Sequence, residues 1–185
     1  MLNSGYKKYQ GRFVLDQTIN KKMKVGINAN YTYSKKYGTI VSESQTSPTA
    51  SLMYALWGYR PVAGVNDSDL LNDLYDESTD PTTDLRINPL MAAENEYNPL
   101  FTYNFIGNAY LEYKILKNLT LKITGGYNKI HQRKEVFFNS NSRGGHRYSN
   151  NKVNGWITNT ERTSLLNENT LTYDVPLKKG HRLKV

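Results

Sequence analysis

The stretch Met23-Lys24-Val25-Gly26-Ile27-Asn28-Ala29-Asn30-Tyr31-Thr32-Tyr33-Ser34 decides the fold. Every odd position in it is apolar or aromatic, and every even position except Gly26 carries a polar side chain. Successive side chains of a β-strand point to opposite faces of a sheet. A period of two therefore predicts a strand with one apolar and one polar face.

The same alternation recurs along the chain, and short turns join the alternating runs in pairs. Asn20-Lys21-Lys22 forms the first of these turns and Leu116-Lys117-Asn118 the second. Odd positions are apolar on both sides of each turn, as a tight hairpin requires. We predict strands at about residues 9–19, 23–34, 102–116, 119–131, 157–175 and 181–185.

Two long segments, at about residues 35–101 and 132–156, separate the hairpins and are rich in Asn, Ser, Thr, Gly or Pro. Short turns that alternate with long loops are typical of outer-membrane barrels, with the turns on the periplasmic side and the loops outside. The fold class expected is all-β, with antiparallel β-hairpins forming part of a large transmembrane outer-membrane β-barrel. Apolar residues at helical offsets between Pro48 and Trp57 predict one short helix in the first extracellular loop.

The composition agrees with a barrel better than with a compact soluble core. Only 38% of the 185 residues are hydrophobic, and 15 of them are tyrosines. A barrel wall meets lipid on one face and water on the other, so a polar average is compatible with insertion. No run approaches the ~20 apolar residues of a transmembrane helix. The first residues lack the apolar core of a signal peptide, so the export signal is expected to be missing.

Aromatic residues gather on the predicted apolar face near the ends of the strands. Such girdles mark the two membrane interfaces of a barrel. The alternative is that tyrosine is simply a favourable strand residue. The girdle near the long loops contains Tyr9, Tyr31, Tyr33, Tyr103, Phe105 and Tyr127, and the one near the short turns contains Tyr113 and Tyr173.

Several strings resemble the SusC/RagA family of TonB-linked outer-membrane transporters. The resemblance rests on the order and spacing of segments over nearly the whole chain rather than on a catalytic signature. The strings are Tyr6-Lys7-Lys8-Tyr9-Gln10-Gly11-Arg12-Phe13-Val14-Leu15-Asp16-Gln17, residues 24–34, Leu56-Trp57-Gly58-Tyr59-Arg60-Pro61, Asn88-Pro89, Asn98-Pro99, residues 107–122, Gly126-Tyr127 and Asn169-Thr170-Leu171-Thr172-Tyr173-Asp174.

This resemblance implies a cell outer membrane location and a barrel of about 22 strands filled by a plug domain and energised through TonB. The chain is expected to be an internal slice of that barrel, with the signal peptide, the plug domain and the C-terminal strands absent. It also implies the partners: outer-membrane lipid, the TonB complex acting through the missing plug, a SusD-like surface lipoprotein, and a glycan, oligosaccharide or peptide substrate.

Trp57, Tyr59, Arg60 and Asn66 are the candidate substrate-binding residues of the first long loop. Aromatic faces stack on sugar CH groups, and polar side chains read hydroxyl groups. The alternative is that Trp57 and Tyr59 form the core of the loop itself.

Nothing in the sequence predicts catalysis, a cofactor or a metal site. His131, His146 and His181 are far apart and have no metal-binding spacing. No nucleophile elbow, phosphate-binding loop or zincin helix is present, so we expect no enzyme activity. Acidic residues between Asp67 and Asp84 could gather calcium ligands, although a solvated acidic loop is the simpler interpretation.

Two other classes of protein compete with the transporter. A soluble β-sandwich that binds glycans or acts in adhesion would bury the alternating face against a second sheet. The net charge of +8 could instead indicate a nucleic-acid-binding sheet. Much of that charge lies at the turns, where lysine solvates a bend, so no nucleic acid is expected as a partner.

Overall fold

The structure is a computed structural model that describes residues 4–38, 56–57, 88–142, 144–145, 152–176 and 182–184. The chain forms two compact units. Unit 1 comprises Met1–Lys7, Lys35–Phe101 and Arg133–Asn159, and unit 2 comprises Lys8–Ser34, Thr102–Gln132 and Thr160–Val185. The predicted helix at 48–57 and the loop residues around it lie almost wholly outside the described residues. Leu56 and Trp57 are described there, and both are helical.

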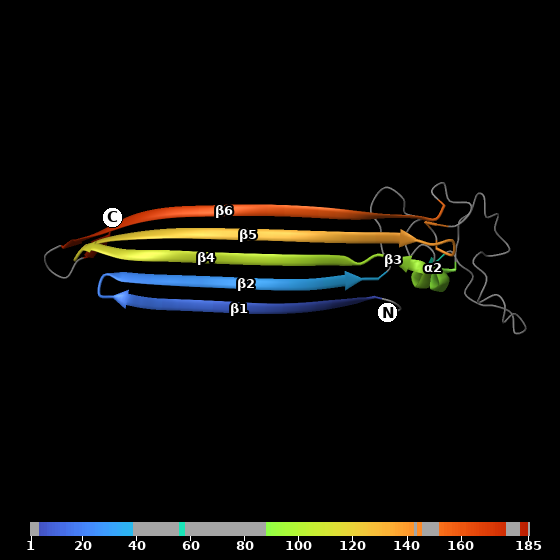
Figure 1. The fold of residues 1–185 in the computed structure, drawn as a ribbon, viewed down its shortest axis with the longest axis horizontal. Coiled ribbons are helices and arrows are strands. Elements are labelled where there is room, and N and C mark those ends of the chain that lie inside the picture. Colours follow the sequence, from blue (N-terminus) through green and yellow to red (C-terminus); the bar gives the residue numbers. More distant parts are fainter. Residues whose placement is uncertain are drawn as a thin grey trace, which may run out of the picture. The chain divides into compact units, whose positions relative to one another are not determined.

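Among the described residues the strands form one antiparallel sheet, which agrees with the predicted all-β fold. Its order is β1-β2-β4-β5-β6-β7, and β3 pairs with β5. The long strands lie side by side in that order (Figure 1). The strands are β1 (Gly5–Asn20), β2 (Met23–Tyr37), β3 (Glu96–Tyr97), β4 (Leu100–Leu116), β5 (Leu119–Phe138), β6 (Asn154–Pro176) and β7 (Arg182–Lys184).

Unit 2 contains most of the five long strands and the two tight turns between them. Because β1 runs through Asn20, two residues separate β1 from β2, not the three predicted. The Asn20 side chain closes this turn by accepting a hydrogen bond from the Lys22 amide at 2.8 Å. Asparagine favours turns because its side chain can bond to the backbone two residues on.

Strand β5 extends beyond the predicted end at about residue 131, and β6 begins before residue 157. For β5 the reason is pairing with a segment distant in the sequence, which the alternation along a single strand cannot reveal. Glu96 and Tyr97 of β3 pair with Phe138 and Phe137, and the Glu135 amide donates to the Pro99 carbonyl at 3.0 Å. These contacts keep the end of β5 extended within unit 1.

Unit 1 also contains helix α2 (Pro89–Asn95), which the periodicity did not predict. The helix begins after Asn88, whose side chain accepts hydrogen bonds from the Leu90 and Met91 amides at 3.0 and 3.4 Å. Proline suits the first helical position because its missing N–H would have no partner there. The helix leads directly into β3 (Figure 1). No helix among the described residues is both long enough and apolar enough to cross a membrane.

Few apolar side chains are buried in the described part of the chain. The buried hydrophobic residues are Ala93 and Val136, both in unit 1. Large apolar side chains of unit 2 remain exposed, including Phe13 at 57% and Ile27 at 44%. A sandwich would cover one sheet face with a second sheet. The described strands supply no second sheet, so the apolar face of unit 2 stays open.

Candidate functional site: a two-faced wall and a polar hollow

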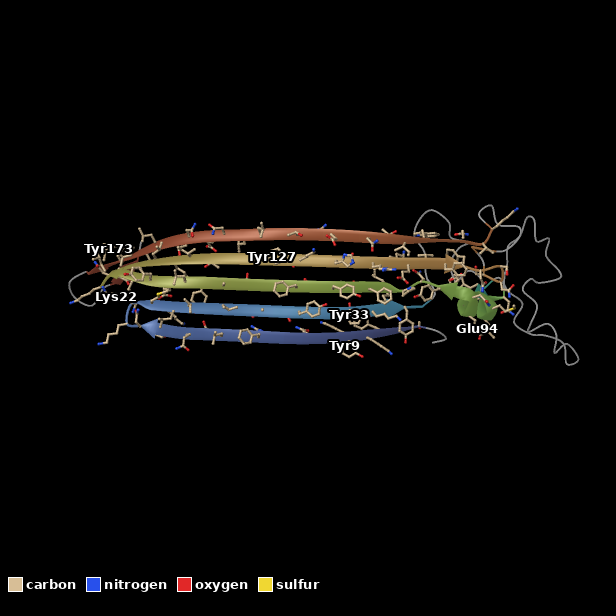
Figure 2. All side chains as sticks on the ribbon, in the orientation of Figure 1. Tyr9, Lys22, Tyr33, Glu94, Tyr127 and Tyr173 are labelled. Atoms are coloured by element: carbon tan, nitrogen blue, oxygen red, sulfur yellow. The ribbon has the colours of Figure 1, made fainter. Side chains whose placement is uncertain are left out.

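Odd-numbered residues of unit 2 share one face of the sheet, which we call the odd face. A row of rings crosses four strands there. Tyr9 stacks on Tyr33 with ring centroids 6.2 Å apart, Tyr33 lies 5.1 Å from Tyr103, and Tyr103 lies 5.8 Å from His131. Figure 2 shows Tyr9 and Tyr33 on neighbouring strands. The structure thus brings together four ring side chains that lie far apart in the sequence, from Tyr9 to His131.

A second aromatic pair adjoins this row. Phe105 and Tyr127 lie 6.1 Å apart, and with Tyr31 and Tyr103 they line a hollow of about 260 Å³. Lys129 and His131 form the remainder of its lining. All six residues predicted for the girdle near the long loops therefore lie on the odd face. Tyr173 lies at the turn end of the sheet with Lys22, as Figure 2 shows.

A charged group borders the hollow. Glu161 of β6 lies 3.1 Å from His131 Nδ1 and 3.6 Å from Lys129 Nζ. The Lys129 and Glu161 side chains are 42% and 57% exposed, so solvent reaches both. Exposed ion pairs of this kind contribute ~0.2–1 kcal/mol to stability. These contacts place the Lys129 ammonium and the Glu161 carboxylate beside the aromatic lining of the hollow.

Even-numbered residues occupy the other face of unit 2, which we call the even face, and they are mainly polar. Gln10 Nε2 donates to Asn30 Oδ1 at 3.1 Å, and Arg12 Nε donates to Asn28 Oδ1 at 3.4 Å. These bonds join β1 to β2 through side chains. The two faces therefore differ in chemistry, as the alternation along residues 23–34 predicts.

Tyr110 ties three strands together on the even face. Its ring lies over Gly26 of β2, and its hydroxyl donates a hydrogen bond to Asp16 of β1. Lys24 and Lys122 place their ammonium groups 5.8 and 5.1 Å from the ring centroid. A cation within about 6 Å of an aromatic face is attracted by the ring quadrupole. Sequence analysis missed this cluster, although Gly26 was the one even position without a polar side chain.

Unit 1 carries a more polar hollow of about 390 Å³ beside α2. Tyr37, Tyr97 and Phe137 contribute rings to its lining, and Lys35 and Glu94 contribute charges. Asn139 Nδ2 donates to Asn95 Oδ1 at 2.7 Å and so fixes the end of β5 against α2. Figure 2 shows Glu94 on the helix. The helix start could have been read from Asn88-Pro89, since Asn is a favoured N-cap and Pro a favoured first residue.

Tyr97 belongs to a short polar chain within unit 1. Its hydroxyl donates to Glu135 Oε2 at 3.0 Å, and Arg133 Nε donates to Glu135 Oε1 at 2.7 Å. The hydrogen bond to Glu135 raises the pKa of Tyr97 above its ordinary value of 10.0. Burial and the negative charge of Glu135 act in the same direction, and Arg133 opposes them.

Of the four predicted substrate-binding residues, Trp57 is the one that the described ranges include. Trp57 is 81% exposed. Tyr59, Arg60 and Asn66 lie outside the described residues, as do the acidic run from Asp67 to Asp84 and the side chains of His146 and His181. His131 contacts Glu161. Within the described ranges no three His, Asp or Glu residues gather as metal ligands.

These features define the class of protein: a section of β-barrel wall, with an open apolar face, a polar face and hairpin turns at one end. Two solved structures share the fold. One is the RagAB peptide importer in its closed-closed state, with a TM-score of 0.64, and the other is the RagAB peptide transporter, with a TM-score of 0.61. Each is 18% identical in sequence, and each alignment covers 98% of this chain and 19% of the other.

The resemblance to RagA-type proteins is thus confirmed at the level of the fold, and the chain spans about a fifth of the matched chains' length. No protein-family model matches the sequence, and no curated protein matches it.

Proposed function

We propose that this chain forms part of the wall and extracellular surface of a TonB-dependent outer-membrane transporter of the SusC/RagA type. The observation that carries the proposal is the open two-faced sheet. Its odd face is apolar with a row of rings, its even face is polar, and the described strands leave both faces uncovered. Lipid on one side and water on the other satisfy both faces at once.

The transported substrate would be a peptide or an oligosaccharide. The fold likeness to a peptide importer supports the peptide. Exposed Trp57, with Tyr59, Arg60 and Asn66 nearby in the sequence, supplies stacking and hydrogen-bonding groups that suit either substrate. A plug moved through TonB would drive transport, and a SusD-like surface lipoprotein would deliver substrate. The chain would bind and guide substrate without catalysing a reaction.

The proposed function can be tested by antibody detection of the protein in fractionated cell envelopes. An antibody raised against the Trp57 loop should detect an outer-membrane band whose migration changes on heating and whose mass is several times the 21.2 kDa of this chain. Folded barrels migrate differently because their closed sheets resist detergent until they are heated. A soluble band at 21.2 kDa would overturn the proposal and favour the glycan-binding or adhesion module.

A further inference from the structure

We propose that the aromatic hollow on the odd face of unit 2 binds one membrane lipid whose headgroup carries a phosphate and a primary ammonium, a phosphoethanolamine group. The proposal rests on the proposed function, because it requires the odd face to meet lipid. It adds a ligand and a site to that function. The hollow would hold part of an acyl chain, and the charged residues beside it would hold the headgroup.

The acyl chain is argued from the lining of the hollow. The rings of Tyr31, Tyr103, Phe105 and Tyr127 line an open hollow of about 260 Å³, which gives room for several methylene groups. Strands β2, β4 and β5 supply these rings, so the sheet itself sets their spacing. Aromatic side chains at a membrane interface pair an apolar ring with a wet polar tip. A hydrocarbon segment is the ligand that such a lining suits.

The headgroup is argued from the charges at the border of the hollow. Lys129 and His131 belong to the lining, and Glu161 lies within 3.6 Å of the Lys129 ammonium. A phosphate oxygen accepts hydrogen bonds from Lys129, and a primary ammonium donates to the Glu161 carboxylate. Both bonds are charge-assisted and are stronger than neutral ones. The side chains are part exposed, so a headgroup at the interface can reach them.

This pair of charges discriminates among headgroups. A glycerol headgroup offers no positive charge to Glu161, and a choline group carries methyls where ethanolamine has N–H donors. A purely anionic lipid would also place its charge beside the Glu161 carboxylate. The site therefore favours phosphoethanolamine over both alternatives.

The test uses the protein that carries this chain, purified into nanodiscs containing equal amounts of phosphatidylethanolamine, phosphatidylglycerol and phosphatidylcholine. Native mass spectrometry counts the lipids that stay bound. We expect phosphatidylethanolamine to be retained about two- to fivefold over the other two, the size of one exposed ion pair. Glu161→Gln should abolish the preference over phosphatidylglycerol, and Lys129→Gln should lower retention of all three lipids.

Matched controls come from the even face of the same two strands. Glu168→Gln on β6 and Lys122→Gln on β5 remove the same charges from the even face and should leave lipid retention unchanged. Equal retention of the three lipids, or equal effects of Glu161→Gln and Glu168→Gln, would overturn the lipid site.

Flotation of the protein with lipid vesicles is measured alongside. If the protein floats but shows no lipid preference, only the lipid site is overturned. If the protein does not float, the proposed function as part of a membrane barrel is overturned as well.

Discussion

At the scale of single residues, a side chain at Gly26 would disturb the contacts of Tyr110 on the even face. A Cβ atom there would meet the ring of Tyr110 and would lie 2.6 Å from Asp16 Oδ1. Gly26→Ala should push the ring off β2 and break its bond to Asp16. We expect a loss of ~1–3 kcal/mol of folding stability, the usual cost of overpacking, measured by urea unfolding in detergent micelles.

Gly11 provides the matched control for this substitution, because a Cβ on it would meet nothing within 4 Å. Gly11→Ala should leave stability unchanged or raise it slightly, since alanine restricts the unfolded chain. Equal losses for the two variants would show that Tyr110 does not depend on the open space at Gly26.

The hydrogen bond between Tyr97 and Glu135 should depend on pH. Its raised pKa reflects the hydrogen bond to Glu135, so the contribution of this contact is complete below pH ~10 and is lost as the pH rises through the raised value. The difference in alkaline absorbance between the parent protein and Tyr97→Phe reports this phenol. Glu135→Gln should lower the pKa of Tyr97, because the negative charge is removed. An unchanged titration in Glu135→Gln would contradict the assignment.

At the scale of elements, helix α2 depends on its cap. With seven residues it is too short to be stable through its own hydrogen bonds. Asn88→Ala removes the acceptor of the Leu90 and Met91 amides and should destabilise the helix by ~0.5–2 kcal/mol. Hydrogen exchange at the Leu90 and Met91 amides should accelerate by the factor that corresponds to this loss of helix stability. Asn88→Ser, which keeps a capping oxygen, should exchange much as the parent does, and identical rates in Asn88→Ala would refute the cap.

At the scale of the whole molecule, an added charge should impair membrane insertion on the odd face of the sheet and be tolerated on the even face. Ile27 lies on the odd face and is 44% exposed, and Asn28 follows it on the even face. In a bilayer, Ile27→Lys should cost ~2–4 kcal/mol, as lysine does on the lipid face of a barrel near the midplane. The fraction of protein that reaches the heat-modifiable form in vesicles measures this cost.

Asn28→Asp is the control for Ile27→Lys, because its charge faces water in a barrel wall and its carboxylate can still accept the hydrogen bond from Arg12. It should insert nearly as well as the parent. A soluble sandwich predicts a different pattern, in which both variants fold without vesicles. Comparable insertion of the two variants would argue against lipid on the odd face.

Much of the fold is local and can be predicted from the sequence by itself. The period of two along residues 23–34 assigns the strand and its faces, and the same phase on both sides of the turns gives the hairpins. Asn20 marks the first turn because its side chain bonds to the backbone two residues on. The girdle tyrosines could be placed on one face for the same reason: side-chain direction in a strand depends only on whether positions are odd or even.

The tertiary structure decided which residues meet across strands, because register is set by pairing between segments far apart in the chain. It placed Tyr110 over Gly26, brought Glu161 to Lys129 and His131, and extended β5 to Phe138 through its pairing with β3. The alternation of apolar and polar residues along one strand carries no information about its register with a neighbouring strand. The sequence therefore determined what each strand offers on its two faces, and only the folded sheet determined which of those side chains act together.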